Sequence, residues 1–213
     1  TGFDEWKGIV DYQGVKEVVY HDGIIYASTS TSGGTNTSPV SGTSAVVFAY
    51  DLAERKIIAT FDPAQYGFRS SVPTISGIEI DENGNLWCVV SETLFTLKLN
   101  KEAGSFTYNE KLSFSKSTYD LTQNRANSDL VIRDGYIYVA FERIGSLCKV
   151  NMNNPSDYTL LLPDVTSDGQ VPESFVFGED GNLYYLLGTS LKMLALNPTD
   201  EEWAAADAVT EQI

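Results

Sequence analysis

The sequence predicts an all-β protein: a β-propeller of four-stranded antiparallel blades, with four blades visible in its 213 residues. Three observations predict this fold. One hairpin cassette recurs four times, each copy is followed by two further strand-like segments, and no segment keeps a helical period. The four blades make either a complete ring or part of a larger propeller. A β-sandwich is the main alternative, but a sandwich has less reason to repeat one hairpin so regularly.

Each cassette consists of an apolar strand, a tight turn that ends in Gly, and a strand rich in Tyr, Trp and Ile. The turn glycines are Gly23, Gly84, Gly135 and Gly181, at spacings of 61, 51 and 46 residues. Asp-Gly and Asn-Gly supply the positive φ angles that a tight hairpin needs. We therefore interpret these acidic turns as structural. The run 81–85 resembles a calcium loop but lacks the downstream bidentate Glu.

The predicted strands form one domain, residues 1–213. Its blades are 15–62, 73–114, 129–162 and 173–209, and residues 1–14 contain a possible ring-closing strand. The expected strands are 15–21, 23–30, 44–51 and 56–62; 73–81, 85–91, 93–99 and 105–114; 129–133, 136–143, 146–152 and 158–162; 173–178, 182–188, 190–196 and 202–209. The last strand competes with a short helix around 201–206, where Glu and Ala predominate.

Composition and charge exclude some functions. The formal net charge is −15 and the pI is about 4.3, so clustered basic residues for nucleic acid or an anionic membrane are not expected. No long apolar span predicts membrane insertion. Cys88 and Cys148 fall in apolar strands and are expected to be buried free thiols. The acidic, Ser/Thr/Tyr/Asn-rich composition favours an exported protein that is periplasmic, at the cell surface or secreted.

Successive strands of a blade run in opposite directions, so the connections alternate between two faces of the propeller. The face with the long connections is expected to carry function. The long connections 31–43, 63–72, 115–128 and 163–172 fall on one face, and the short turns fall on the other. Aromatic, Arg and Asn side chains in these loops suit recognition of a protein or a carbohydrate. The alternative is that they only pack the loops down. The candidate ligand-binding residues are Tyr66, Phe68, Arg69, Tyr119, Asn124, Arg125 and Asn127.

A second candidate site lies at the mouth of the expected central channel. Aligning the cassettes places Glu17, Gly77, Asp129 and Ser174 at equivalent starts of the innermost strands, with Glu173 just before Ser174. Converging oxygens of Glu17, Asp129 and Glu173 would suit Ca²⁺ or another divalent cation. The alternative is that these are solvated channel carboxylates, and the principal interpretation includes no cofactor.

Catalytic motifs are absent from the sequence. The single histidine, His21, is expected in a short turn away from the long loops, so it is poorly placed for Ser/His/Asp catalysis. There is no P-loop, no G-x-S-x-G and no C-x-x-C. Carboxylate pairs stay open, because spatial neighbours are not visible in a sequence.

The runs Asp81–Trp87 and Glu179–Tyr184 resemble the blade motif of NHL-like, surface-layer-type and streptogramin-lyase-like propellers. The resemblance spans about residues 15–209 and concerns the fold. It implies a ligand-binding or protein-interaction module, or else a metal-dependent lactonase-like or lyase-like enzyme. The lactonase-like branch implies a channel metal held by Glu, Asn and Asp. Glu17 and Asp129 match two such ligands, whereas Gly77 and Ser174 do not.

Overall fold

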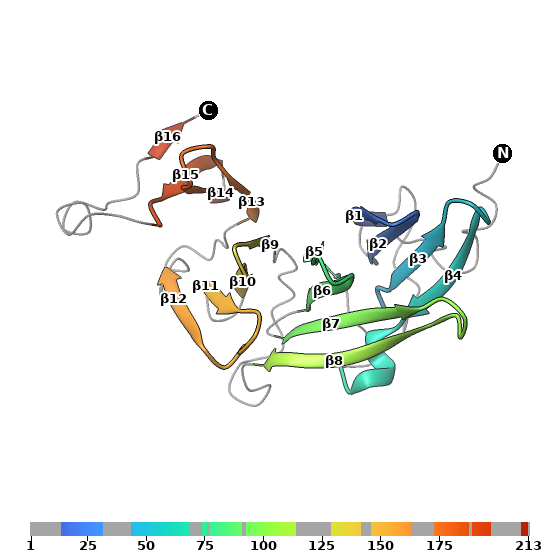
Figure 1. The fold of residues 1–213 in the computed structure, drawn as a ribbon. Helices are drawn as coiled ribbons and strands as arrows, with labels where there is room; N and C mark the ends of the chain where they lie inside the picture. Colours follow the sequence, from blue (N-terminus) through green and yellow to red (C-terminus); the bar gives the residue numbers. More distant parts are fainter. Residues whose placement is uncertain are drawn as a thin grey trace. The chain divides into compact units, whose positions relative to one another are not determined.

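The structure is a computed structural model. It describes residues 14–31, 44–68, 74–75, 77–90, 93–113, 129–141, 146–162, 173–187, 189–196 and 210–212. These residues form four separate four-stranded antiparallel sheets, each a meander in chain order (Figure 1). The predicted all-β fold and its four-stranded blades are confirmed.

The first two sheets belong to one compact unit, Thr1–Ala126, here called unit 1. Blade 1 consists of β1 (Gly14–His21), β2 (Ile24–Ser30), β3 (Val47–Asp51) and β4 (Lys56–Phe61). Blade 2 consists of β5 (Gly77–Ile80), β6 (Asn85–Val90), β7 (Thr93–Asn100) and β8 (Ser105–Ser113). A short 3₁₀ helix, η2 (Pro63–Tyr66), follows β4.

The other two sheets belong to unit 2, Asn127–Ile213. Blade 3 consists of β9 (Leu130–Arg133), β10 (Tyr136–Phe141), β11 (Ser146–Asn151) and β12 (Tyr158–Leu162). Blade 4 consists of β13 (Glu173–Phe177), β14 (Leu183–Leu187), β15 (Ser190–Leu194) and β16 (Thr210–Gln212).

Fifteen of the sixteen predicted strands overlap observed ones. In blade 4, Thr210–Gln212 pairs with β15, directly after the predicted strand 202–209. Residues 201–209 lie outside the described part of the chain, as do residues 1–13 with the possible ring-closing strand.

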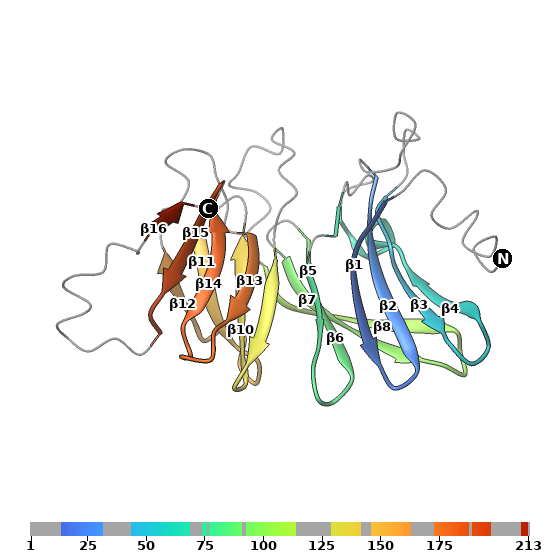
Figure 2. The ribbon, with the colours of Figure 1, turned by 90° about the horizontal axis from the view of Figure 1, so that it is seen from above.

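The tight turns have the predicted backbone. Asp22 and Gly23 have φ angles of 48° and 80°, and Asp134 and Gly135 have 52° and 78°. Two successive positive φ angles fit a type I′ hairpin, whose twist matches that of the strands. Within each unit, the turns after first and third strands lie at one end of the blades (Figure 2), as parity predicts.

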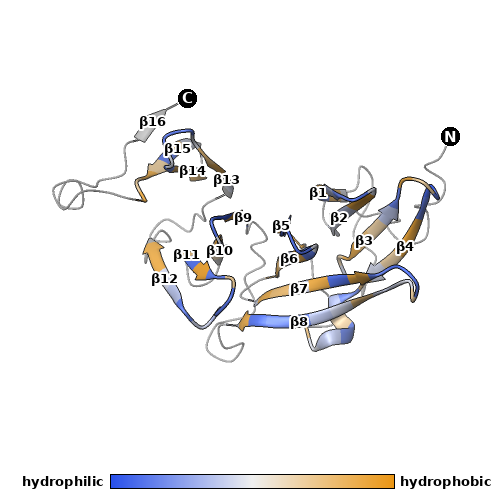
Figure 3. Ribbon diagram, viewed as in Figure 1, coloured by the Kyte–Doolittle hydropathy of each residue, from blue (hydrophilic) through white to orange (hydrophobic). Residues whose placement is uncertain are grey.

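The core lies between the two blades of each unit. In unit 1, buried side chains from both blades meet, among them Phe61, Phe95 and Leu97. In unit 2 the corresponding cluster contains buried Tyr138, Leu147 and Leu183, with partly buried neighbours. Hydropathy follows this arrangement: the third strand of blade 2, β7, is mainly hydrophobic, whereas the outer strand β8 is mainly hydrophilic (Figure 3).

Candidate functional site

Tyr66 and Phe68 follow β4 in the connection between blades 1 and 2. Helix η2 begins with Pro63 and is capped by Asp62, whose Oδ1 accepts a hydrogen bond from Ala64 N at 2.9 Å. Gly67 ends it with a left-handed φ of 81°. Proline at the first helical position and Gly after the last are the usual limits of a helix. This short helix therefore fixes the backbone that carries Tyr66.

The Tyr66 ring is the exposed end of an aromatic cluster. Its centroid lies 4.8 Å from that of Phe61 and 5.0 Å from that of Tyr108. Phe61 and Tyr108 stack in turn, with centroids 5.7 Å apart. Phe61 is 1% exposed and Tyr66 is 41% exposed. Because two rings hold it from below, Tyr66 presents an aromatic surface with little rotational freedom left to lose on binding.

Phe68 has a different role. Its ring packs against Phe95 at 5.6 Å and against Tyr108 at 6.2 Å, and it belongs to the partly buried shell of the unit 1 core. It therefore anchors the connection to the blades, which is the packing alternative considered for all the loop residues. Tyr66 thus lies against β4 and β8, whereas Phe68 lies against β7 and β8.

The sequence did not single out two residues beside Tyr66. Tyr108 Oη donates a hydrogen bond to Glu110 Oε2 at 3.3 Å, and Glu110 is exposed. Burial, followed by the nearby charge of Glu110, raises the pKa of Tyr108 to about 12, so this hydroxyl stays protonated. The alternation of β8 puts Tyr108 and Glu110 on one face, but the sequence does not reveal that Tyr66 covers it. Tyr66, Tyr108 and Glu110 are called the rim surface below.

The remaining candidate ligand-binding residues cannot be placed. Arg69, Tyr119, Asn124, Arg125 and Asn127 lie outside the described residues. Their assignment to the long-loop face stays a prediction.

The candidate metal ligand Glu17 contacts the neighbouring blade. Its Oε2 accepts a hydrogen bond from the backbone N of Ile78 in β5 at 2.9 Å. It also lies near Cys88, whose thiol pKa is raised well above its usual value, first by burial and then by the charge of Glu17. Glu17 thus connects the innermost strands of blades 1 and 2.

Asp129 makes the same connection in unit 2. Its Oδ2 accepts from Phe175 N in β13 at 3.0 Å, and its Oδ1 accepts from Leu130 N at 2.8 Å. A carboxylate that accepts backbone N–H groups is held in one orientation by charge-assisted hydrogen bonds. The two carboxylates therefore tether pairs of adjacent blades.

The register of blade 4 corrects the alignment of the fourth cassette. Glu17 pairs with Ser28, five residues after its turn glycine, and Glu173 pairs with Leu186, also five residues after its own. Ser174 has a φ of 55° and lies in an irregularity of the β13–β14 ladder. Glu173, not Ser174, is therefore equivalent to Glu17. The side chain of Glu173 is not among those described.

Within the described residues, no group of three or more His, Cys, Asp or Glu side chains is arranged to hold a metal ion. Glu17 and Asp129 belong to different units, and each binds backbone N–H groups inside its own unit.

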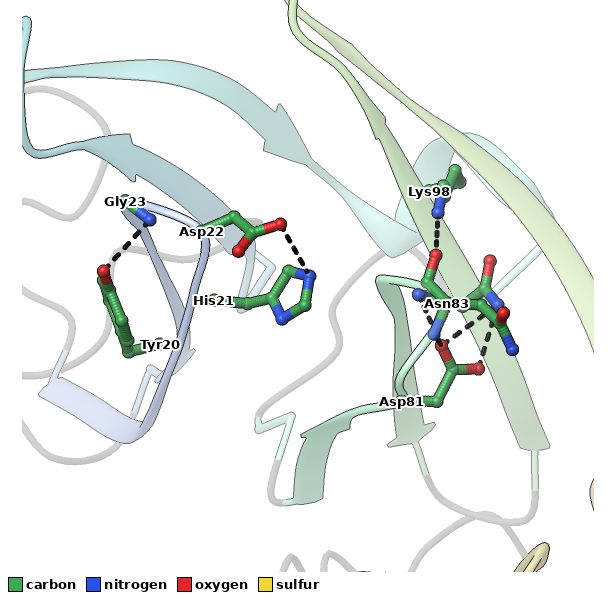
Figure 4. Close-up of polar contacts among 8 residues, drawn as sticks. Tyr20, His21, Asp22, Gly23, Asp81, Asn83 and Lys98 are labelled. Carbon is green, nitrogen blue, oxygen red and sulfur yellow. Dashed lines mark hydrogen bonds and ion pairs between the residues drawn. The ribbon is translucent and has the colours of Figure 1, made fainter.

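His21 lies at the end of β1, on the short-turn face as predicted. Its Nε2 lies 3.3 Å from Asp22 Oδ2 (Figure 4). The same nitrogen would lie 3.4 Å from a Cβ built on Gly84, so His21 packs against the turn of blade 2. Arg133 repeats this arrangement in unit 2: it pairs with Asp134 at 3.3 Å and lies near Gly181. A basic side chain next to Asp-Gly thus contacts the turn of the second blade in both units.

The acidic turn of blade 2 is structural, as the sequence predicted. The carboxylate of Asp81 accepts from Asn83 N, Asn85 N, Asn85 Nδ2 and Trp87 Nε1 at 2.8–3.2 Å, and Figure 4 shows part of this network. Burial alone would raise the pKa of Asp81, but the hydrogen bonds from Asn85, Trp87 and Asn83 together lower it. These four donors occupy the oxygens that a calcium ion would need.

No family model matches the chain, and no curated protein matches it in sequence. Solved structures do match in fold. The extracellular domain of the hybrid two-component system BT4673 from B. thetaiotaomicron superposes with a TM-score of 0.57 at 13% identity, over 93% of this chain and 22% of that one. Virginiamycin B lyase from Staphylococcus aureus gives 0.53 at 12%, over 94% of this chain and 70% of the lyase.

A chain of the nidogen/laminin complex gives a TM-score of 0.54 at 11% identity, over 86% of this chain and 61% of that chain. This chain therefore spans between about a fifth and seven tenths of these structures. No helix among the described residues is long and apolar enough to cross a membrane. At these identities the likeness concerns architecture alone, and the chain has the fold of the β-propellers that the blade motif predicted.

Proposed function

We propose that this chain is a non-enzymatic binding module: an exported or cell-envelope-associated β-propeller that recognises a protein partner through its long-loop face. The main observation in support is the exposed Tyr66 ring, which packs against Phe61 and Tyr108. Tyrosine side chains that keep a fixed, partly exposed ring are frequent anchors of protein interfaces. The ring lies at the long-loop end of β4, at the outer rim of that face.

The structural neighbours support this proposal. One is an extracellular domain and another belongs to the nidogen/laminin complex. A propeller fold serves many functions, so the rim surface, rather than the fold, supports a binding role. Carbohydrate is the second class of ligand that aromatic rings recognise, and it enters the test as a separate outcome.

The metal-dependent lactonase-like or lyase-like alternative is not favoured. The carboxylates of Glu17 and Asp129 point to backbone N–H groups of neighbouring blades, and His21 pairs with Asp22 in a short turn.

The test compares two tyrosines of equal exposure. Tyr66 is 41% exposed, and Tyr158, in β12 of unit 2, is 40% exposed. Immobilised wild type, Tyr66→Ala and Tyr158→Ala are offered extracellular and surface proteins of the source organism, and captured proteins are quantified by mass spectrometry. We expect a partner that the Tyr158→Ala variant retains and that Tyr66→Ala binds about tenfold more weakly or worse.

The same three proteins are placed on a glycan array. Binding of a glycan that depends on Tyr66, with no protein partner, would replace protein by carbohydrate in the proposal. A partner that both variants retain equally would show that Tyr66 is not part of the contact.

A further inference from the structure

The rim surface combines an exposed ring with an exposed carboxylate. Tyr66 and Tyr108 are 5.0 Å apart between centroids, and the Tyr108 hydroxyl binds Glu110 Oε2. Among the described residues, no lysine or arginine lies over the Tyr66 ring or pairs with Glu110. The surface thus carries both an aromatic face and a negative charge without a described cationic partner.

Elsewhere the chain places its own cations on comparable rings. Lys149 Nζ lies 4.1 Å from the centroid of Tyr136, and the Arg133 guanidinium lies 4.5 Å from that of Phe177 while it also pairs with Asp134. A cation over a ring face gains from the quadrupole of the ring, and a nearby carboxylate adds a charge-assisted hydrogen bond. Arg133 therefore shows, within unit 2, the combination of ring and carboxylate that the rim surface offers.

The net charge of the chain also favours a positively charged partner. The chain has a formal net charge of −15, so its field attracts positively charged partners and repels acidic ones. A neutral glycan would gain nothing from this field.

We propose that the protein partner of the rim surface inserts a lysine or arginine side chain over the Tyr66 ring and pairs it with Glu110. This inference rests on the proposed function and specifies the chemistry of the partner. Tyr66 provides the face, Tyr108 orients Glu110, and Glu110 provides the charge.

The test uses the folded chain and hexa-arginine as the probe, with hexaglutamate and xylohexaose as the acidic and neutral comparisons. Affinity is measured by isothermal titration calorimetry at two salt concentrations. We expect Tyr66→Leu, which keeps an apolar side chain on Phe61 but removes the ring, and Glu110→Gln each to weaken hexa-arginine binding about two- to fivefold. Tyr66→Phe keeps the wild-type affinity, because the ring face is retained.

Matched controls separate the rim surface from the general field. Glu102→Gln removes the same charge from an exposed residue in the β7–β8 turn, at the other end of β8, and Tyr158→Leu removes a ring of equal exposure. Both are expected to bind hexa-arginine like wild type. Equal weakening by Glu110→Gln and Glu102→Gln would overturn the inference, since the field alone would then explain binding. Xylohexaose binding that depends on Tyr66 would also overturn it, in favour of a glycan.

Failure of this inference is distinguishable from failure of the proposed function. If a captured protein partner needs Tyr66 but binds Glu110→Gln as tightly as wild type, the proposed function stands and the inference of a basic side chain fails. If no captured partner depends on Tyr66, both the proposed function and the inference fail.

Discussion

The two units repeat the same contacts between their blades. In each, a carboxylate at the start of the first blade binds a backbone N–H of the second, Glu17 to Ile78 and Asp129 to Phe175. In each, a basic side chain before Asp-Gly lies against the turn glycine of the second blade. The two pairs of blades therefore share these contacts, with tight Asp-Gly turns in blades 1 and 3 and longer turns in blades 2 and 4.

The units differ in how completely the seam between their blades is filled. In unit 1, Phe61, Phe95 and Leu97 are buried to 1% exposure or less. In unit 2, Leu147 and Leu183 are equally buried, but the aromatic rings of β13, Phe175 and Phe177, are only partly buried. The same carboxylate-to-backbone hydrogen bonds thus join blades whose apolar side chains are buried to different extents. Stability in unit 1 should depend mainly on apolar burial, and stability in unit 2 relatively more on polar contacts.

The largest effect is expected from removing a seam aromatic. Phe61→Ala deletes a fully buried ring that contacts Tyr66, Phe95 and Tyr108, and should lower the free energy of unfolding by about 3–5 kcal/mol. Phe177→Ala, in the partly buried seam of unit 2, should cost about half of that. Urea unfolding followed by circular dichroism measures both. Equal costs would show that the two seams are packed alike.

The acidic turns give the next comparison. Asp81 is 6% exposed and accepts from Trp87 and three groups of Asn83 and Asn85, so Asp81→Ala should cost about 2–3 kcal/mol. Asp180 makes equivalent bonds to Asn182 and Tyr184 but is exposed, and Asp180→Ala should cost clearly less. A large loss with Asp180→Ala would mean that the turn contributes independently of burial.

The pH dependence of stability follows from the same carboxylate. The pKa of Asp81 is lowered in the folded protein, so folding favours its ionised form. Its contribution is complete above the unfolded pKa of about 3.9 and is lost as the pH falls through the lower folded value. The free energy of unfolding of wild type should therefore drop more steeply below about pH 4 than that of Asp81→Asn. Parallel profiles would contradict the lowered pKa.

The blades and their turns could be predicted from the sequence, but the contacts between blades could not. The positions of Gly23, Gly84, Gly135 and Gly181 fixed where strands reverse, because positive φ angles are a local requirement. The contact of Glu17 with Ile78 joins residues 61 positions apart, and no local pattern encodes it. The bulge at Ser174 likewise shifted the fourth cassette by one residue.

The candidate site was predicted in part for the same reason. Tyr66 was singled out because it stands in a long connection between two blades. Tyr66 is exposed whereas Phe68 is partly buried. This difference depends on η2 and on the ring of Tyr108, which belongs to blade 2. Glu110 gave no signal, since an exposed acid on an outer strand is ordinary in a chain of this charge.

The tethers are the third comparison. Glu17→Ala removes the acceptor of one backbone N–H and Asp129→Ala removes the acceptor of two, and each should cost about 1–2 kcal/mol. Glu17→Gln and Asp129→Asn keep an oxygen acceptor and should lose less. Thermal unfolding with and without Ca²⁺ is measured on all five proteins, wild type included. A rise in Tm with Ca²⁺ that only wild type shows would instead support the channel metal site.

The smallest difference concerns the order in which the units open. Each unit holds one buried thiol: burial and then Glu17 raise the pKa of Cys88, and burial raises that of Cys148 to about 12. Neither should react with a thiol reagent at pH 8 until its unit opens. We expect pulse labelling in urea to reach Cys148 about tenfold faster than Cys88, a difference of about 1.4 kcal/mol in opening free energy. Mass spectrometry of the two cysteine peptides reads both sites in one sample, so each serves as the control for the other. Simultaneous labelling would mean that the less filled seam of unit 2 is not its weak point, and that the two pairs of blades unfold as one cooperative structure.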